Sequence, residues 1–252
     1  MVEVKNVSKA YGGKAVVENV SVRIAKGTVT SFIGPNGAGK STLLSMVSRL
    51  IKKDSGEIWI EGRELGKWDN NELAKTISIL KQSNHINIRL TVKDLVGFGR
   101  FPYSQGRLTK EDRRFIDEAI DYMELGDMRD SYLDQLSGGQ RQRAFISMVI
   151  AQNTDYILLD EPLNNLDMKH SVQIMKVLKN MVADLGKTIV LVLHDINFAS
   201  CYSDCIVALK NGKVVREGPT ADMIQTPVLR DIYDMHIPIE TINGNKIAVY
   251  FS

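Results

Sequence analysis

Apolar and polar residues alternate along the first thirty positions, which is typical of β-strands. The alternation covers VEVKNV (2–7), AVVENVSVRI (15–24) and TVTSFIG (28–34), with glycine-containing turns between them. The stretch SGEIWIEGREL (55–65) has the character of another strand with a turn at each end. The N-terminal part is therefore predicted to combine an antiparallel β-sheet with a strand, loop and helix that follow it.

Helical spacing replaces this alternation in several later segments. In STLLSMVSRL (41–50) it predicts one apolar face made of Leu43, Leu44, Val47 and Leu50. A second helix is predicted to begin after the polar Thr109, with an apolar face made of Phe115, Ile116, Ala119, Ile120 and Met123. QRQRAFISMVIAQ (140–152) is helical too, and no strong strand signal appears from about 92 to 154. We therefore expect a helical insertion in an α/β domain.

Continuous apolar runs return after this insertion. YILLD (156–160) and TIVLVL (188–193) suit parallel strands that are buried on both faces. Two hairpins follow, with Asn-Gly turns at 211–212 and 243–244. The predicted fold is α/β: a mixed sheet with helices, an N-terminal antiparallel β-subdomain and an inserted α-helical subdomain. Residues 1–90 plus 153–252 would form the α/β core, and about 91–152 the helical subdomain of a single 1–252 domain.

Composition narrows the class of protein. The chain has 252 residues, of which 44% are hydrophobic and 25% are charged, as in soluble globular domains. A formal net charge of +2 offers no strong electrostatic case for nucleic acid as a partner. No apolar run is long enough to span a membrane, and the N-terminal segment has no apolar signal core. We expect a chain that touches a membrane only through a partner protein.

GPNGAGKST (34–42) fits the P-loop pattern, which binds nucleotide phosphates. Its glycines let the backbone turn tightly and direct several N–H groups at one anion. Lys40 is expected to reach the β- and γ-phosphates, and Ser41 to place its hydroxyl on Mg²⁺. The predicted nucleotide-binding residues of this loop are Gly34, Pro35, Asn36, Gly37, Ala38, Gly39, Lys40, Ser41 and Thr42.

Two adjacent acids narrow the reaction. Asp160 ends a predicted buried strand, where a carboxylate can hold Mg²⁺, and Glu161 follows it directly. A second carboxylate is not needed for magnesium but can orient or deprotonate a water molecule. A P-loop kinase would need a pocket for a second substrate, which the sequence does not identify. The pair therefore favours a hydrolase over a kinase.

His194 ends a second buried strand, at the edge where α/β folds bind ligands. This position favours a functional role over a structural one. The only two cysteines, Cys201 and Cys205, lie shortly after it, so a metal site is conceivable. Metal ligands usually come in tighter pairs, and we therefore favour two reduced thiols in a packed segment.

LSGGQ (136–140) raises the possibility of a second anion site. Ser137 lies where a helix N-cap belongs, and Gly138 and Gly139 leave N–H groups free at the start of the helix. Considered alone, the stretch could equally be a capped helix with a glycine hinge.

Together these motifs resemble the nucleotide-binding subunit of an ABC transporter, in the family's order and over essentially the whole chain. Tyr11 matches the aromatic residue that stacks on adenine, GPNGAGKST the Walker A motif, and Gln82 the Q-loop glutamine. LSGGQ matches the signature, YILLDEP the Walker B motif with the catalytic glutamate, NNLD the D-loop ending in Asp167, and His194 the switch histidine. Leu163 departs from the threonine that many relatives have there, outside the catalytic carboxylates.

The resemblance implies roles for these residues. The catalytic residues would be Glu161, which polarises the attacking water, His194, which contacts the γ-phosphate, and Gln82. The implied metal ligands would be Ser41, Gln82 and Asp160, with ATP and Mg²⁺ as the bound cofactors. Members of the family close head to tail on two ATP molecules, so that ATP would also be contacted from the other subunit by Ser137, Gly138, Gly139, Gln140 and Asp167.

The resemblance favours an importer over an exporter because no membrane helices are fused to the ATPase. The segments 97–103 and 194–218 look similar to those of iron–siderophore, haem and cobalamin uptake ATPases. Expected partners are membrane permease subunits that contact residues near 82–106, a second copy of the chain and, indirectly, an extracytoplasmic substrate-binding protein. The expected location is the cytoplasmic face of the cell membrane. Iron–siderophore uptake is the favoured function, and haem or cobalamin import and a soluble, non-transport ATPase remain alternatives.

Overall fold

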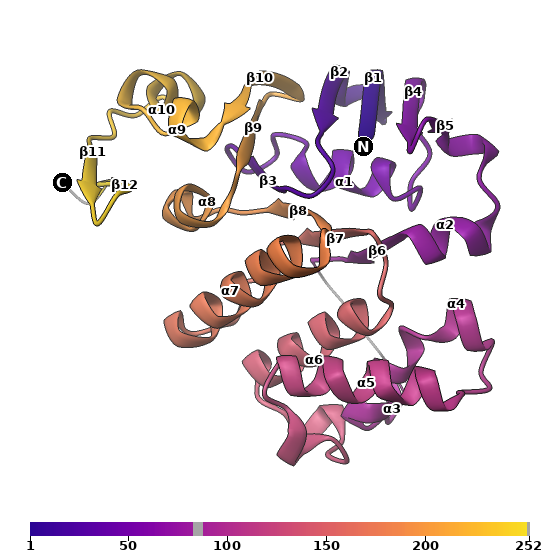
Figure 1. Cartoon of the computed structure of the whole chain (residues 1–252). Helices are drawn as coiled ribbons and strands as arrows, with labels where there is room; N and C mark the ends of the chain where they lie inside the picture. The colour runs from indigo at the N-terminus through magenta and orange to yellow at the C-terminus, as the bar shows by residue number, and fades with distance from the viewer. Residues whose placement is uncertain (83–87, 251–252) are drawn as a thin grey trace.

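A six-stranded sheet forms the centre of the molecule in the computed structural model, which describes residues 1–82 and 88–250 (Figure 1). Its strand order is β10-β9-β3-β8-β7-β6. The strands are β3 (Val29–Ile33), β6 (Ile77–Leu80), β7 (Tyr156–Asp160), β8 (Thr188–Val192), β9 (Cys205–Lys210) and β10 (Lys213–Pro219). All neighbours pair in parallel except β9 and β10. The prediction of a mixed sheet with buried parallel strands is confirmed.

A separate antiparallel sheet is formed by N-terminal strands on both sides of β3 in the sequence, and it confirms the predicted N-terminal β-structure. Its strand order is β2-β1-β4-β5, with β1 (Val2–Tyr11), β2 (Lys14–Ile24), β4 (Ser55–Ile60) and β5 (Arg63–Glu64). The Asn-Gly turns at 211–212 and 243–244 join β9 to β10 and β11 (Ile239–Ile242) to β12 (Asn245–Ala248), as predicted. Strand β6 was not predicted, since its four residues ISIL are too short to show a period.

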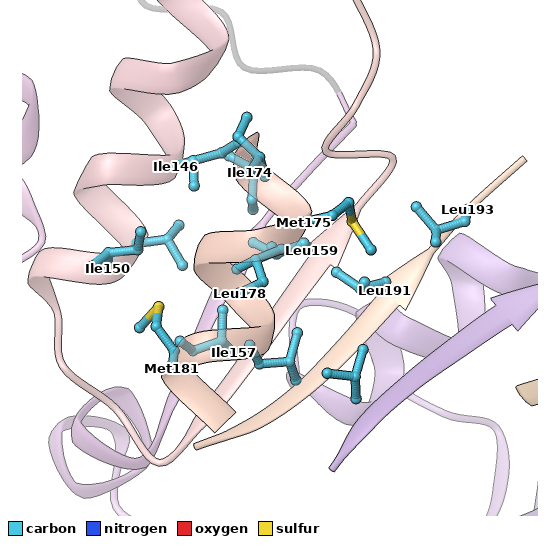
Figure 2. Packing of buried hydrophobic residues seen from close by; sticks show 14 of the residues in the cluster. Ile146, Ile150, Ile157, Leu159, Ile174, Met175, Leu178, Met181, Leu191 and Leu193 are labelled. Atoms are coloured by element: carbon cyan, nitrogen blue, oxygen red, sulfur yellow. The ribbon is translucent and has the colours of Figure 1, made fainter. Parts of the chain in front are cut away.

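The two faces of the central sheet bury different hydrophobic clusters, because successive side chains of a strand point to opposite sides. On β8, Leu191 packs with one cluster and Val192 with the other. Helix α7 (Met168–Leu185) covers the first face, and its residues from Ile174 to Met181 lie between this face and helix α6 (Gly138–Ala151) (Figure 2). Helix α1 (Lys40–Val47) belongs to the second cluster. The glycine loop therefore lies between two elements with buried apolar faces.

Helices follow one another between β6 and β7, in the lower part of Figure 1. They are α3 (Val92–Phe98), α4 (Phe101–Ser104), α5 (Lys110–Tyr122) and α6. Thr109 caps α5 through a capping box with Asp112, as its polar start indicated. Of the predicted apolar face of α5, Phe115 is only partly buried, and the guanidinium of Arg100 lies 4.4 Å from the centre of its ring. The other predicted positions on this face are buried.

The remaining helices flank the strands. They are α2 (Asn70–Thr76), α8 (Ile196–Tyr202), α9 (Thr220–Met223) and α10 (Thr226–Tyr233). The prediction for Leu50 was wrong: α1 ends at Val47, and Leu50 is 46% exposed. The cause is Arg49, whose φ of 60° is left-handed and turns the chain away from the helix axis. Among the described residues, no helix is both long and apolar enough to cross a membrane.

Candidate functional site

The carboxyl ends of four parallel strands meet at one edge of the central sheet. β3 runs directly into the glycine loop, and β7 ends at Asp160. Gln82 follows β6 by two residues, and His194 follows β8 by two residues. Because parallel strands have their carboxyl ends on the same edge, segments that are far apart in sequence converge there.

The glycine loop forms a cradle that side chains would fill. Gly37 and Gly39 have φ angles of 76° and 97°, in the region that favours glycine. A Cβ on Gly39 would lie 2.6 Å from the carbonyl oxygen of Val16, which is too close. Gly39 is the N-cap of α1 and provides no side-chain cap. Among the residues that the structure describes, the N–H groups of Gly37 and Gly39 donate to no backbone carbonyl, so they can bind an anion.

Lys40 is buried beneath this cradle. Its ammonium donates to the carbonyl oxygens of Gly34 at 2.7 Å and Pro35 at 3.0 Å. Burial lowers the pKa of Lys40, and the nearby carboxylates of Asp160 and Glu161 oppose that shift. The lysine is therefore a cation held at the loop by carbonyl groups, which a phosphate could replace as its partner.

Asp160 lies next to the start of α1. The hydroxyl of Ser41 donates to its Oδ1 at 2.8 Å. Burial raises the pKa of Asp160, and the hydrogen bond from Ser41 opposes that effect. A carboxylate and a hydroxyl oxygen at this separation are hard donors of the kind that Mg²⁺ prefers. The two side chains therefore suit a magnesium ion, and they lie at the same end of α1 as the phosphate cradle.

Glu161 is held by three side chains from three segments. His194 Nε2 lies 2.5 Å from its Oε1, while Gln82 donates to its Oε2 at 2.8 Å and Asn164 at 2.5 Å. Burial raises the pKa of Glu161, but the bonds from these side chains outweigh it and hold the pKa below its usual value. Glu161 has a left-handed φ of 52°, which is uncommon outside glycine. The site thus contains an ionised, oriented carboxylate beside the phosphate cradle.

A cavity of about 550 Å³ joins these groups. It is lined by Val16, by Asn36, Gly37, Ala38, Gly39, Lys40, Ser41 and Thr42 of the loop, and by Gln82, Glu161, Asn164 and His194. Two of these residues, Val16 and Asn164, were not predicted from the sequence as part of the site. Asn164 lies one turn after Glu161, a spacing that could have signalled a contact, whereas nothing in the sequence of β2 marks Val16.

The residues of LSGGQ do not line this cavity. Ser137 is the N-cap of α6, as predicted, and its hydroxyl accepts from the N–H of Gln140 at 3.3 Å. In return, the side chain of Gln140 accepts from the N–H of Ser137 at 2.8 Å. A Cβ on Gly139 would lie 3.4 Å from the carbonyl oxygen of Asn165. The signature loop therefore packs against the D-loop of its own chain.

Tyr11 and Asp167 also lie outside the lining of the cavity. Tyr11 ends β1 and is 51% exposed, with the ammonium of Lys9 5.3 Å from the centre of its ring. Asp167 is the N-cap of α7, where its carboxylate accepts from the N–H of His170 at 2.9 Å. Gly34 and Pro35 lie below the cavity and contact it through Lys40. The predicted site residues therefore divide into three groups: those that line the cavity, those at the surface, and Gly34, Pro35 and Asp160, which contact the lining residues Lys40 and Ser41.

Both cysteines are partly buried and have free thiols, in α8 and at the start of β9. Burial raises the pKa of each thiol. In the part of the chain that the structure describes, no three His, Cys, Asp or Glu side chains form a metal-binding group.

Comparisons with known proteins agree with this geometry. The ABC transporter family profile matches residues 17–164. The chain is 72% identical to the petrobactin import ATP-binding protein YclP of Bacillus subtilis (strain 168), over 100% of both chains. It is 48% identical to the petrobactin import ATP-binding protein FatE of Bacillus anthracis, over 99% of this chain and 100% of that one.

Solved structures are similar over most of the chain. The dimeric structure of MJ0796, a bacterial ABC transporter cassette, matches with a TM-score of 0.80 and 36% identity, over 87% of this chain and 99% of that one. The dimeric post-hydrolysis state of the same cassette, bound to ADP and Pi, matches with a TM-score of 0.79 and 37% identity over the same shares.

Proposed function

The chain belongs to the ABC transporter family as an ATP-binding and ATP-hydrolysing subunit, and we propose that it powers the import of a ferric siderophore of the petrobactin kind. The observation that carries this proposal is the 72% identity to a petrobactin import ATP-binding protein over the full length of both chains. A second petrobactin import protein, at 48% identity, supports the same cargo. Haem and cobalamin are not favoured by these relatives.

The cavity is the proposed ATP site. The free N–H groups of the glycine loop and the ammonium of Lys40 would bind the phosphates, and Tyr11 would stack on adenine. Ser41 and Asp160, with Gln82, would hold Mg²⁺, which supplies charge neutralisation at the β- and γ-phosphates when bound. The chemistry of the two oxygen donors supports this assignment.

Glu161 is the proposed base that orients water for attack on the γ-phosphate. In the structure its carboxylate is engaged by His194, Gln82 and Asn164. As ATP enters, a water molecule would take the place of one of these side chains on the Glu161 carboxylate. His194 would then be free to contact the γ-phosphate. The hydrogen bonds that lower the pKa of Glu161 keep the carboxylate ionised, so that it can accept a hydrogen bond from water.

Two copies of the chain would complete each ATP site. Ser137, Gly138, Gly139, Gln140 and Asp167 would then contact ATP bound to the loop of the other copy. Their position outside the cavity and the dimeric form of the similar cassette support this arrangement. Turnover should therefore rise more steeply than in proportion to protein concentration.

The remaining partners would be permease subunits on the cytoplasmic face of the membrane and, through them, an extracytoplasmic substrate-binding protein. The permease would contact residues near 82–106, of which 83–87 lie outside the described residues. Residues 91–152 would act as a helical subdomain that carries the signature loop towards the second copy. Two relatives of this chain are named as import ATP-binding proteins, which supports a membrane partner for it.

Uptake of labelled iron tests the cargo. A deletion strain would be complemented with this chain and supplied with ⁵⁵Fe–petrobactin, labelled haem or labelled cobalamin. We expect the wild-type chain, and not Glu161→Gln, to restore uptake of ⁵⁵Fe–petrobactin alone. Restoration of haem or cobalamin uptake without petrobactin uptake would refute the proposed cargo while leaving the ATPase assignment intact.

A further inference from the structure

Gly34, the first residue of the glycine loop, is bonded on both sides of its backbone. Its carbonyl oxygen accepts from the ammonium of Lys40 at 2.7 Å. Its N–H donates to the hydroxyl of Tyr233, near the other end of the chain, at 3.1 Å. One residue of the loop thus connects the phosphate-binding lysine to the last residue of helix α10.

Gly34 has little freedom to find another partner. Its φ of 134° lies in the region that favours glycine, and a Cβ there would lie 1.9 Å from the carbonyl oxygen of Leu209 on β9. The loop is therefore pressed against the backbone of β9 where β3 ends. An N–H in such a place needs an acceptor, because a buried donor without one is costly.

Tyr233 is held firmly enough to serve as that acceptor. Helix α10 buries Leu229 and Ile232, and its end is fixed by Lys210 of β9. The ammonium of Lys210 donates to the carbonyl oxygen of Asp231 and to the carboxylate of Asp234, both at 2.8 Å. Since β9 pairs directly with β3, the helix end and the glycine loop rest on the same strand.

The phenol of Tyr233 keeps one protonation state. Burial raises its pKa to about 12, and the hydrogen bond from Gly34 opposes that effect. The hydroxyl is therefore neutral wherever the protein works and can accept from Gly34 at every such pH.

We propose that Tyr233 is a positioning residue for ATP binding: its hydroxyl fixes the backbone of Gly34, which in turn sets the position of Lys40. Helix α10 then belongs to the nucleotide site although none of its residues lines the cavity. The proposal rests on the cavity being the ATP site. It predicts that removal of the Tyr233 hydroxyl changes the affinity of the site for the phosphates of ATP.

The experiment compares Tyr233→Phe with the wild type in the full chain. We expect the Kd and KM for ATP to rise about 5- to 10-fold, because the N–H of Gly34 loses its acceptor. At saturating ATP, kcat should change less than about twofold, since Glu161 and its partners are untouched. Amide exchange at Gly34, measured by NMR without nucleotide, should become faster.

Tyr202→Phe is the matched control. Tyr202 is a partly buried tyrosine of α8 that stacks on Phe198 with ring centres 6.1 Å apart, and it does not line the cavity. Tyr202→Phe should leave the Kd and KM for ATP and the amide exchange of Gly34 as in the wild type. A second variant, Lys210→Met, loosens the end of α10 without touching Tyr233 and should raise KM about twofold in the same direction.

Two outcomes would overturn the positioning role. One is a lower melting temperature for Tyr233→Phe with unchanged Kd and KM for ATP, which would make the hydroxyl merely structural. The other is a lower kcat with an unchanged KM, which would place its effect on the chemical step. If wild-type protein bound no ATP, the proposed ATP site itself would fail, and that result is read from the wild type alone.

Discussion

Helices α1 and α6 both begin at a glycine-rich stretch, yet their first turns differ. Helix α1 begins after Gly39, which offers no side-chain cap, and the N–H groups of Gly37 and Gly39 donate to no backbone carbonyl of the described residues. Helix α6 begins after Ser137, whose side chain and backbone are paired with Gln140 in a capping box. The capping box satisfies the N–H groups of Ser137 and Gln140. Those of Gly138 and Gly139, like those at the first start, donate to no backbone carbonyl of the described residues.

The difference shows why a glycine-rich helix start does not by itself make an anion site. The first start also has a buried cation, Lys40, and two carboxylates nearby. Glu161 lines the cavity, and Asp160 accepts a hydrogen bond from Ser41, which also lines it. The start of α6 does not line this cavity and packs against Asn165 of the D-loop. We infer that the unpaired N–H groups of Gly138 and Gly139 contact a phosphate only when a second copy brings one.

The largest expected effect is on the carboxylate beside the first helix start. Glu161→Gln should lower kcat about 1000-fold while ATP binding is retained, because an amide cannot accept the proton of water. Steady-state phosphate release and equilibrium ATP binding measure the two quantities. Asn164→Ala, which removes one partner of Glu161 but keeps the carboxylate, is the control and should retain most activity. Turnover of Glu161→Gln near that of the wild type would show that the base lies elsewhere.

The next effect separates the two helix starts. Ser137→Phe should lower turnover about 100-fold, because a bulky side chain misplaces the signature loop against the other subunit's ATP. Its Kd for ATP in the isolated chain should stay within about twofold of the wild type. A parallel loss of ATP affinity would mean that both starts bind the same ATP within one chain. Activity at several protein concentrations shows whether pairing is affected.

Lys40→Ala probes the first start alone. The Kd for ATP should rise about 30-fold, because the phosphates lose a charged hydrogen-bond donor. Lys52→Ala, on the exposed surface after α1, serves as a control for the loss of one positive charge. Titration of each purified variant with ATP gives the comparison. Equal affinities of Lys40→Ala and wild type would contradict the assignment of the loop.

The smallest effect is on stability. Ser137→Ala removes a cap from α6 and should lower the free energy of unfolding by about 1 kcal/mol. Thr109→Ala removes the equivalent cap from α5, a helix that does not line the cavity. Thermal or urea unfolding should give similar losses for the two variants, whereas only Ser137→Ala should also reduce turnover. If both reduced turnover equally, the effect of Ser137 would be a matter of helix stability alone.

Much of the site was predictable because its residues follow strands that the sequence marks clearly. The apolar runs before Asp160 and His194 indicated buried parallel strands, whose carboxyl ends must share an edge. The capping residues Thr109 and Ser137 were readable for a similar reason, since a cap acts over only three residues. Local sequence patterns therefore predicted both the helices and strands and the strand ends at which the proposed site residues lie.

Contacts between distant segments were not predictable in this way. The bond between Tyr233 and Gly34 depends on how α10 rests on β9, and no local period reports that. Strand β6 is too short for its alternation to be recognised, although it positions Gln82. The roles assigned to Ser137 and Asp167 depend on a second chain and stay predictions.

The place of β8 in the sheet determines when Ser41 and Asp160 can come together during synthesis of the chain. β3 and β7 do not pair with each other, and each pairs with β8 (Thr188–Val192), which lies between them. A nascent chain that ends at Leu185 therefore contains Ser41 and Asp160 but lacks the strand that sets them side by side. The hydrogen bond between Ser41 and Asp160 is therefore expected only after β8 has been synthesised and has joined the sheet.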